Sequence, residues 1–150
     1  MKRSTVVDII SSLLILLFVY TAVSKLLDYS TFKLQLAKSP FISQLASIVV
    51  WALPVGELLA AAALIFKPTR LLGLYASLFL MTMFTAYIWA MLNYSYDIPC
   101  SCGGILSKMG WEEHLWFNAA FVIVCIIGIL AKVNINTIVE AEVVRPIAVS

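Results

Sequence analysis

The chain of 150 residues is 63% hydrophobic and only 12% charged, and its mean hydropathy is +1.02. Soluble domains average about 25% charged residues, so this composition excludes an ordinary soluble domain and indicates an integral membrane protein. The net charge of +2 is small and no basic run is interleaved with aromatic residues, which excludes a nucleic-acid-binding protein.

Four apolar stretches, divided by charged residues, follow one another along the chain. They cover about residues 6–27, 45–66, 71–92 and 114–131. Crossing a hydrocarbon core of about 30 Å takes roughly 20 helical residues, so the first three stretches are long enough and the fourth is at the short end. No alternating barrel pattern is present. We therefore predict an all-α membrane domain over residues 1–131, a bundle of four transmembrane helices.

The beginning of the chain also has features of a cleavable signal peptide. Met1-Lys2-Arg3 precedes the first apolar stretch, and Ala22-Val23-Ser24 near its end offers small residues to a signal peptidase. The stretch is long for a signal peptide and contains Asp8. We therefore expect it to remain in the protein as the first transmembrane helix.

The first long connection contains a short amphipathic segment. Phe32 and Leu36 lie one turn apart on the same face of a helix that should end before Pro40. We expect this helix to lie flat at the membrane interface. Lys25 is a candidate partner for Glu57 in the second apolar stretch, but it lies near the outer end of the first stretch. We therefore expect its ammonium group to extend to the lipid headgroups.

An acidic residue, Glu57, falls near the middle of the second apolar stretch. An ionised carboxylate at that depth costs several kcal/mol, so Glu57 should be neutral, paired or facing a polar cavity. Pro54 and Gly56 weaken and thin the helix beside it and favour such a cavity. Glu57 then serves in a proton relay, as a hydrogen-bonding site for a lipid-soluble electron carrier, or in a structural hydrogen bond. Three residues of the third stretch are candidate partners for that bond: Thr82, Thr85 and Tyr87.

The second long connection carries two cysteines one residue apart, in the sequence Cys100-Ser101-Cys102-Gly103-Gly104. A disulfide between them would close a very small, strained ring, and strained, exposed disulfides exchange readily. Pro99 fixes the chain before the pair, and the glycines let another backbone approach the sulfur atoms. The spacing favours disulfide exchange. Two free cysteines or a permanent local disulfide remain as the alternative.

His114, the chain's only histidine, begins the fourth stretch. Near the cysteines it would accept a thiol proton and raise the fraction of reactive thiolate, whereas at the interface it would bond to water or headgroups. With Cys100 and Cys102 it also offers a ligand set for Cu(I) or zinc. Asn118 lies one turn further along the same face, so both residues are expected to line a pocket. Cys125 is expected to be a small core residue.

The distribution of basic residues predicts the orientation in the membrane. With four spans both termini lie on one side, and that side carries six basic residues against four on the other. The two sets are Lys2, Arg3, Lys67, Arg70, Lys132 and Arg145, and Lys25, Lys33, Lys38 and Lys108. The positive-inside rule places the termini and a tail of residues 132–150 in the cytoplasm. The Cys100/Cys102 loop then faces outward, where disulfides persist.

Four segments of the chain resemble the MauE branch of the DoxX-like membrane proteins. They are Phe18 to Asp28, Pro54-x-x-Glu57, Cys100 to Gly104, and Trp111 to Asn118. The resemblance implies a four-helix protein of the bacterial cytoplasmic membrane that supports disulfide formation or maturation of an extracytoplasmic protein, beside a thioredoxin-fold partner. It also implies that Cys100 and Cys102 are the exchangeable pair.

These observations together predict a membrane thiol-disulfide component. Cys100 and Cys102 exchange disulfides, His114 tunes the thiols, and Glu57 and Asn118 shape a polar pocket. The layout is also similar to that of quinone-linked disulfide-generating membrane proteins, so a quinone is considered as a cofactor, although the second cysteine pair of those proteins is missing here. The alternatives are a non-enzymatic scaffold subunit of a larger membrane complex and a copper- or zinc-binding membrane protein.

Overall fold

The structure, a computed structural model, describes residues 3–94 and 110–144, with side chains described as far as Val139. Every regular element in these ranges is a helix, and no strand occurs in them. The elements are α1 (Arg3–Leu27), α2 (Tyr29–Lys38), a 3₁₀ turn (Ser43–Leu45), α3 (Ala46–Ile65), α4 (Arg70–Tyr94) and α5 (Trp111–Val144).

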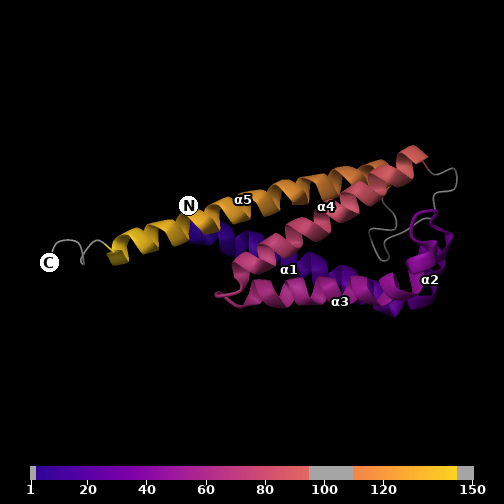
Figure 1. Ribbon diagram of the computed structural model, residues 1–150, viewed down its shortest axis with the longest axis horizontal. Coiled ribbons are helices and arrows are strands. Elements are labelled where there is room, and N and C mark those ends of the chain that lie inside the picture. The colour runs from indigo at the N-terminus through magenta and orange to yellow at the C-terminus, as the bar shows by residue number, and fades with distance from the viewer. Residues whose placement is uncertain (1–2, 95–109, 145–150) are drawn as a thin grey trace.

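Four of the helices are long and apolar enough to cross a membrane: α1, α3 together with the 3₁₀ turn, α4, and α5 as far as Val139. The prediction of an all-α bundle with four candidate spans is therefore confirmed. Figure 1 shows the start of α1, the turn between α3 and α4, and the C-terminal part of α5 toward one end of the bundle, and α2 at the other. Both ends of the described chain thus lie toward the same end.

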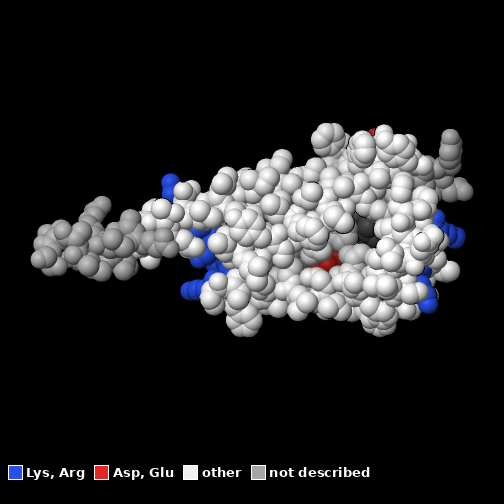
Figure 2. Space-filling model, in the orientation of Figure 1, with Lys and Arg blue, Asp and Glu red and all other residues white. Residues whose placement is uncertain are grey.

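The outside of the bundle is apolar over its middle. Leu16, Leu59, Phe79 and Trp116, one from each long helix, are between 65% and 74% exposed. Figure 2 shows Lys and Arg side chains gathered toward the two ends of this face, with a broad belt between them that is free of Lys and Arg. Such a surface is favourable against lipid and unfavourable against water, as expected for a multi-pass membrane protein.

The core lies where the four long helices meet. Leu14 and Phe18 of α1, Leu64 of α3, Leu74 of α4 and Cys125 of α5 are all at most 1% exposed and belong to one buried cluster. The prediction that Cys125 is a small core residue is confirmed. Because residues from all four helices share this cluster, it holds the helices together at the end of the bundle from which α3 and α4 diverge.

A close contact joins α3 and α4 near their connecting turn. A Cβ atom added to Gly73 would lie 2.8 Å from the backbone nitrogen of Leu64 and 2.9 Å from the carbonyl carbon of Ala63. Only a residue without a side chain allows the two backbones to come this near. From this point the two helices diverge toward the α2 end of the bundle (Figure 1).

The predicted short helix in the first connection is present as α2. It ends at Lys38, and Ser39 follows in an extended conformation before Pro40. Leu36 is buried with Ala46 and Val50 of α3, and Ser39 accepts a hydrogen bond of 3.0 Å from the Tyr87 hydroxyl of α4. These contacts attach α2 to the bundle. Its position at a membrane interface remains a prediction.

Helix α5 continues well past the predicted end of the membrane domain at Ala131. It reaches Val144, and Figure 1 shows its last part extending beyond the other helices. Polar residues end the apolar stretch, but no Pro or Gly lies between Ala131 and Val144 to end the helix. Residues 132–144 of the expected tail are therefore helical. The location of this segment in the cytoplasm remains a prediction.

The contact at Gly73 gives a test of the bundle. We expect Gly73→Ala to destabilise the protein by about 1–3 kcal/mol, because the added methyl group collides with the backbone of α3 as well as with the Leu64 side chain, and the backbone cannot move aside easily. Thermal unfolding in detergent measures the effect.

Gly56→Ala is the matched control, because a Cβ atom at Gly56 meets no other atom within 4 Å. It should leave the unfolding temperature unchanged or raise it slightly, since alanine favours a helix. Equal unfolding temperatures for the two variants would contradict the close packing of α3 and α4.

Candidate functional site

A cavity of about 300 Å³ lies inside the bundle near α2, and all five helices contribute to its walls. Most of its lining side chains are apolar. Its polar and charged lining residues come from every helix: Thr21, Lys25, Gln35, Glu57, Tyr87, His114 and Asn118. A mainly apolar cavity with a few converging polar groups is the usual form of a small-molecule site.

The cavity has an open side between α3 and α4. Val49 and Leu53 of α3 and Phe79 and Met83 of α4 line it, and the last two are also 65% and 56% exposed on the outside of the bundle. Figure 2 shows the surface hollowed between these helices, with red carboxyl atoms beside the hollow. Glu57 is the only acidic residue in either helix. The opening therefore connects the cavity and its few polar groups with the apolar, lipid-facing surface.

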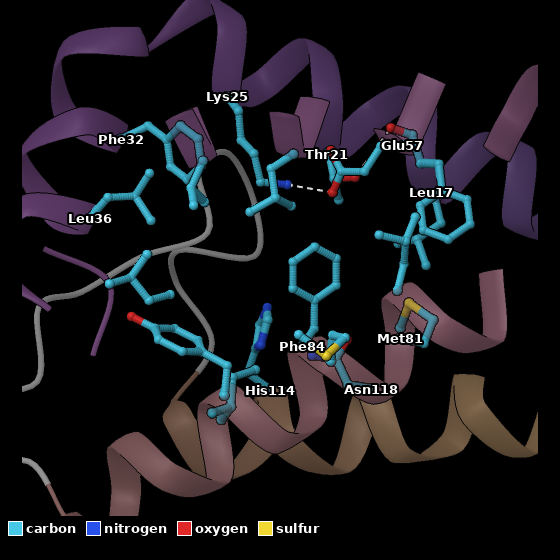
Figure 3. A pocket seen from close by; sticks show the side chains of 18 of the residues that line it. Leu17, Thr21, Lys25, Phe32, Leu36, Glu57, Met81, Phe84, His114 and Asn118 are labelled. Atoms are coloured by element: carbon cyan, nitrogen blue, oxygen red, sulfur yellow. Dashed lines mark hydrogen bonds and ion pairs between the residues drawn. The ribbon is translucent and has the colours of Figure 1, made fainter. Parts of the chain in front are cut away.

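A buried ion pair lies in the wall of the cavity. Lys25 Nζ of α1 is 2.7 Å from Glu57 Oε1 of α3, and the side chains are only 5% and 1% exposed. The ammonium group also lies 6.0 Å from the centre of the Phe32 ring and 5.6 Å from that of Phe84. Both distances are in the range of cation–π attraction. Figure 3 shows the pair and these rings facing the cavity.

The expectation that Lys25 extends to the lipid headgroups is wrong. The physical reason is the position of α2, which follows α1 after a single residue and places the Phe32 ring near the ammonium group. The route to the headgroups is thereby covered, and the nearest group of opposite charge is Glu57. Pairing satisfies two charges that would each be costly alone in the bundle.

The expectation that Glu57 is paired or faces a polar cavity is confirmed, but the suggested partners on α4 are wrong. The Thr82 and Thr85 hydroxyls donate to the carbonyl oxygens of Leu78 and Met81 in their own helix, at 2.7 Å each. Tyr87 donates to Ser39. Threonine in a helix commonly bonds to the carbonyl four residues earlier, and this local bond takes precedence here.

His114 and Asn118 both line the cavity, as their spacing predicts. They lie in the first two turns of α5, where the His114 backbone N–H donates to Gly110 O at 2.9 Å. The side chains are 9% and 5% exposed, yet His114 Nε2 and Asn118 Nδ2 have no hydrogen-bond partner in the part of the chain that the structure describes. Figure 3 shows them across the cavity from Lys25 and Glu57.

A third polar atom of the cavity, Glu57 Oε2, is also buried without a partner among residues 3–94 and 110–139. Leaving a buried polar atom unpaired costs about 1–3 kcal/mol, and more for a charged group. Glu57 of α3 and His114 and Asn118 of α5 each line the cavity with such an atom. A molecule in the cavity that offers both donors and acceptors would satisfy them.

Cys100 and Cys102 lie outside the described residues, so their roles and their distance from His114 remain predictions. The same holds for the copper or zinc hypothesis, which depends on them. In the described ranges, no three His, Cys, Asp or Glu side chains gather as a metal site would require.

Two residues of the site, Lys25 and Thr21, were not expected from the sequence. Thr21 lies one turn before Lys25 on α1, lines the cavity beside Glu57, and donates its hydroxyl to Phe18 O at 3.2 Å. The sequence does contain a signal for the pairing of Lys25, because a lysine and a glutamate in consecutive apolar stretches can neutralise each other inside the membrane. Thr21 gives no such signal.

The ion pair predicts strong energetic coupling between α1 and α3. Lys25→Met and Glu57→Leu should each destabilise the protein by about 3–5 kcal/mol, because each leaves a buried charge without its partner. The double variant should lose far less than the sum, since it removes both charges together. Chemical unfolding in detergent micelles measures the free energy of unfolding of the wild-type chain, the two single variants and the double variant.

The control for this double-mutant cycle is a second cycle on the more exposed ion pair of Arg70 and Asp8, whose side chains are 16% and 59% exposed. Its coupling should be at most about 1 kcal/mol, since solvent screens it. Additive effects of Lys25→Met and Glu57→Leu would contradict a buried ion pair.

Comparison with known families identifies this chain. The family model for the methylamine utilisation protein MauE matches residues 3–131. No curated protein and no solved structure matches the chain. The matched range contains all four candidate spans, apart from the last residues of α5, and every residue that lines the cavity. The chain therefore belongs to the MauE family of membrane proteins.

Proposed function

We propose that the protein is a thiol-disulfide component of the bacterial cytoplasmic membrane that supports disulfide formation or maturation of extracytoplasmic proteins. The observation that carries this proposal is the MauE match, because its range includes both Cys100 and Cys102 as well as the whole cavity. The protein exchanges disulfides with a thioredoxin-fold partner. Its termini are cytoplasmic and its cysteine loop faces outward, in accord with the charge distribution.

The exchange moves two electrons from the partner to this chain. A thiolate of the partner attacks the Cys100–Cys102 disulfide, which forms a mixed disulfide and releases one cysteine thiolate of this chain. The second thiolate of the partner then attacks the mixed disulfide. The partner leaves oxidised, and Cys100 and Cys102 are reduced by two electrons. The glycines after Cys102 give the partner's backbone access to the sulfur atoms.

His114 supports the exchange from the cavity. It lies in the first turn of α5, shortly after the connection that holds the cysteines, and its Nε2 atom has no hydrogen-bond partner among the described residues. A neutral imidazole can accept the proton of a thiol and so raise the fraction of thiolate, which is the nucleophile. Glu57 and Asn118 shape the polar pocket beside it. No methylamine-specific feature enters this proposal.

Trapping of mixed disulfides tests the proposal. In Cys100→Ser or Cys102→Ser, the remaining thiolate can attack the disulfide of the oxidised partner, which forms a mixed disulfide and releases one partner thiolate. The variant has lost the neighbouring cysteine that would release the partner again, so the mixed disulfide should be more abundant than in the wild-type chain. We expect a reductant-sensitive adduct in membranes of at least one single variant, and its loss in the double variant. Non-reducing electrophoresis and mass spectrometry detect the adduct and identify the partner.

Cys125→Ala is the matched control, because Cys125 is fully buried in the core. It should leave the adduct unchanged when combined with either variant. Absence of any adduct, together with free and unreactive thiols at Cys100 and Cys102 in oxidised membranes, would overturn the proposal and favour a scaffold subunit.

A further inference from the structure

We propose that the cavity binds a neutral, lipid-soluble ring with polar oxygens at its opposite edges, the chemistry of an isoprenoid quinone or its quinol. The inference goes beyond the proposed function, because it concerns the intramembrane cavity and depends on neither cysteine. It stands on three observations: the opening of the cavity, the placement of its unpartnered polar atoms, and its charge balance.

The opening determines where the ligand comes from. The cavity is reached between α3 and α4, and its edge is formed by Phe79 and Met83, which are also exposed on the apolar outside of the bundle. A ligand that enters here comes from the lipid. A volume of about 300 Å³ is at the lower end of the range for small-molecule sites and suits a substituted ring. An apolar tail would remain outside, between the diverging helices.

The polar atoms lie on two facing sides of the cavity. Lys25 and Glu57 are on one side, and His114 and Asn118 are on the other, with apolar side chains between them (Figure 3). Asn118 Nδ2 can only donate a hydrogen bond, ionised Glu57 Oε2 can only accept one, and His114 Nε2 can do either. A ring with oxygens at opposite edges reaches both sides at once.

This set of groups matches both redox forms of a quinone. The carbonyl oxygens of the oxidised ring accept hydrogen bonds from Asn118 on one side and from the Lys25 ammonium on the other. The hydroxyl groups of the reduced ring can instead donate to Glu57 Oε2 and to His114 Nε2. The rings of Phe32 and Phe84 line the cavity and provide flat apolar surfaces for ring contact.

The charge of the site selects against acidic lipids. Lys25 and Glu57 neutralise one another at 2.7 Å in a buried position, so the cavity wall carries no net charge. A fatty-acid carboxylate or a lipid phosphate would add an uncompensated negative charge beside the Glu57 carboxylate. A neutral ring adds none. The neutral ligand is therefore favoured over the anionic lipids of the membrane.

Titration of the purified full chain with decylubiquinone tests the inference. All four tryptophans lie in the described ranges, and only Trp111 lines the cavity, so bound quinone should quench its fluorescence saturably. Asn118→Leu keeps the approximate shape of the side chain but removes its donor. It should raise the dissociation constant about tenfold, because one well-formed hydrogen bond typically contributes about that factor to binding.

Two controls complete the titration. Asn93→Leu changes an exposed asparagine outside the cavity and should leave the dissociation constant unchanged. Trp111→Phe should remove the saturable part of the quenching. Absence of saturable quenching in the wild-type chain, or equal affinity in Asn118→Leu, would overturn the inference. So would competitive displacement of decylubiquinone by oleate, because that would show a site for an anionic lipid.

Photolabelling of the wild-type chain with an azidoquinone tests the site without a variant. We expect the label on peptides of α4 around Phe84 and of α5 around His114, which lie on the cavity wall. Labelling confined to other helix surfaces would overturn the inference. Because neither experiment involves Cys100 or Cys102, a failure here leaves disulfide exchange standing, and a failure of the trapping experiment leaves quinone binding standing.

Discussion

The ion pair between Lys25 and Glu57 is the constraint on which the rest of the site depends. Each charge alone would be unstable inside an apolar bundle, so the two helices that carry them, α1 and α3, must bring them together. The pair leaves Glu57, which lines the cavity, with its Oε2 atom unpartnered among the described residues. A single interaction thus joins two helices and supplies one polar wall of the cavity.

Two further features of the fold make room for the cavity around this pair. Gly73 brings α3 and α4 into close contact near their turn, and the helices diverge from there toward α2 (Figure 1). Helix α2 then covers the other end, because Leu36 packs on α3 and Phe32 lies near Lys25. The first turns of α5 add the second polar wall. The result is a mainly apolar cavity with two polar walls that opens toward lipid.

The sequence predicts the four apolar helices well, since their length and composition follow directly from the thickness of a bilayer. It also predicts that Glu57 is paired or faces a cavity, because a lone charge inside the membrane is costly. It predicts that His114 and Asn118 share a face, because helical spacing alone determines which residues lie on one side of a helix. It fails for Lys25, whose surroundings depend on how α2 folds back over α1. The end of α5 is missed as well, because hydropathy marks the end of an apolar stretch and not the end of a helix.

The most direct test of this account is the ionisation state of Glu57 in a lipid bilayer. Infrared difference spectra between the wild-type chain and Glu57→Gln report whether the side chain is a carboxylate or a protonated carboxyl group. A buried ion pair predicts that the variant loses a carboxylate band, because the Lys25 ammonium group stabilises the ionised form of Glu57. Loss of a protonated carboxyl band instead would contradict the ion pair, and with it the charge-balanced cavity.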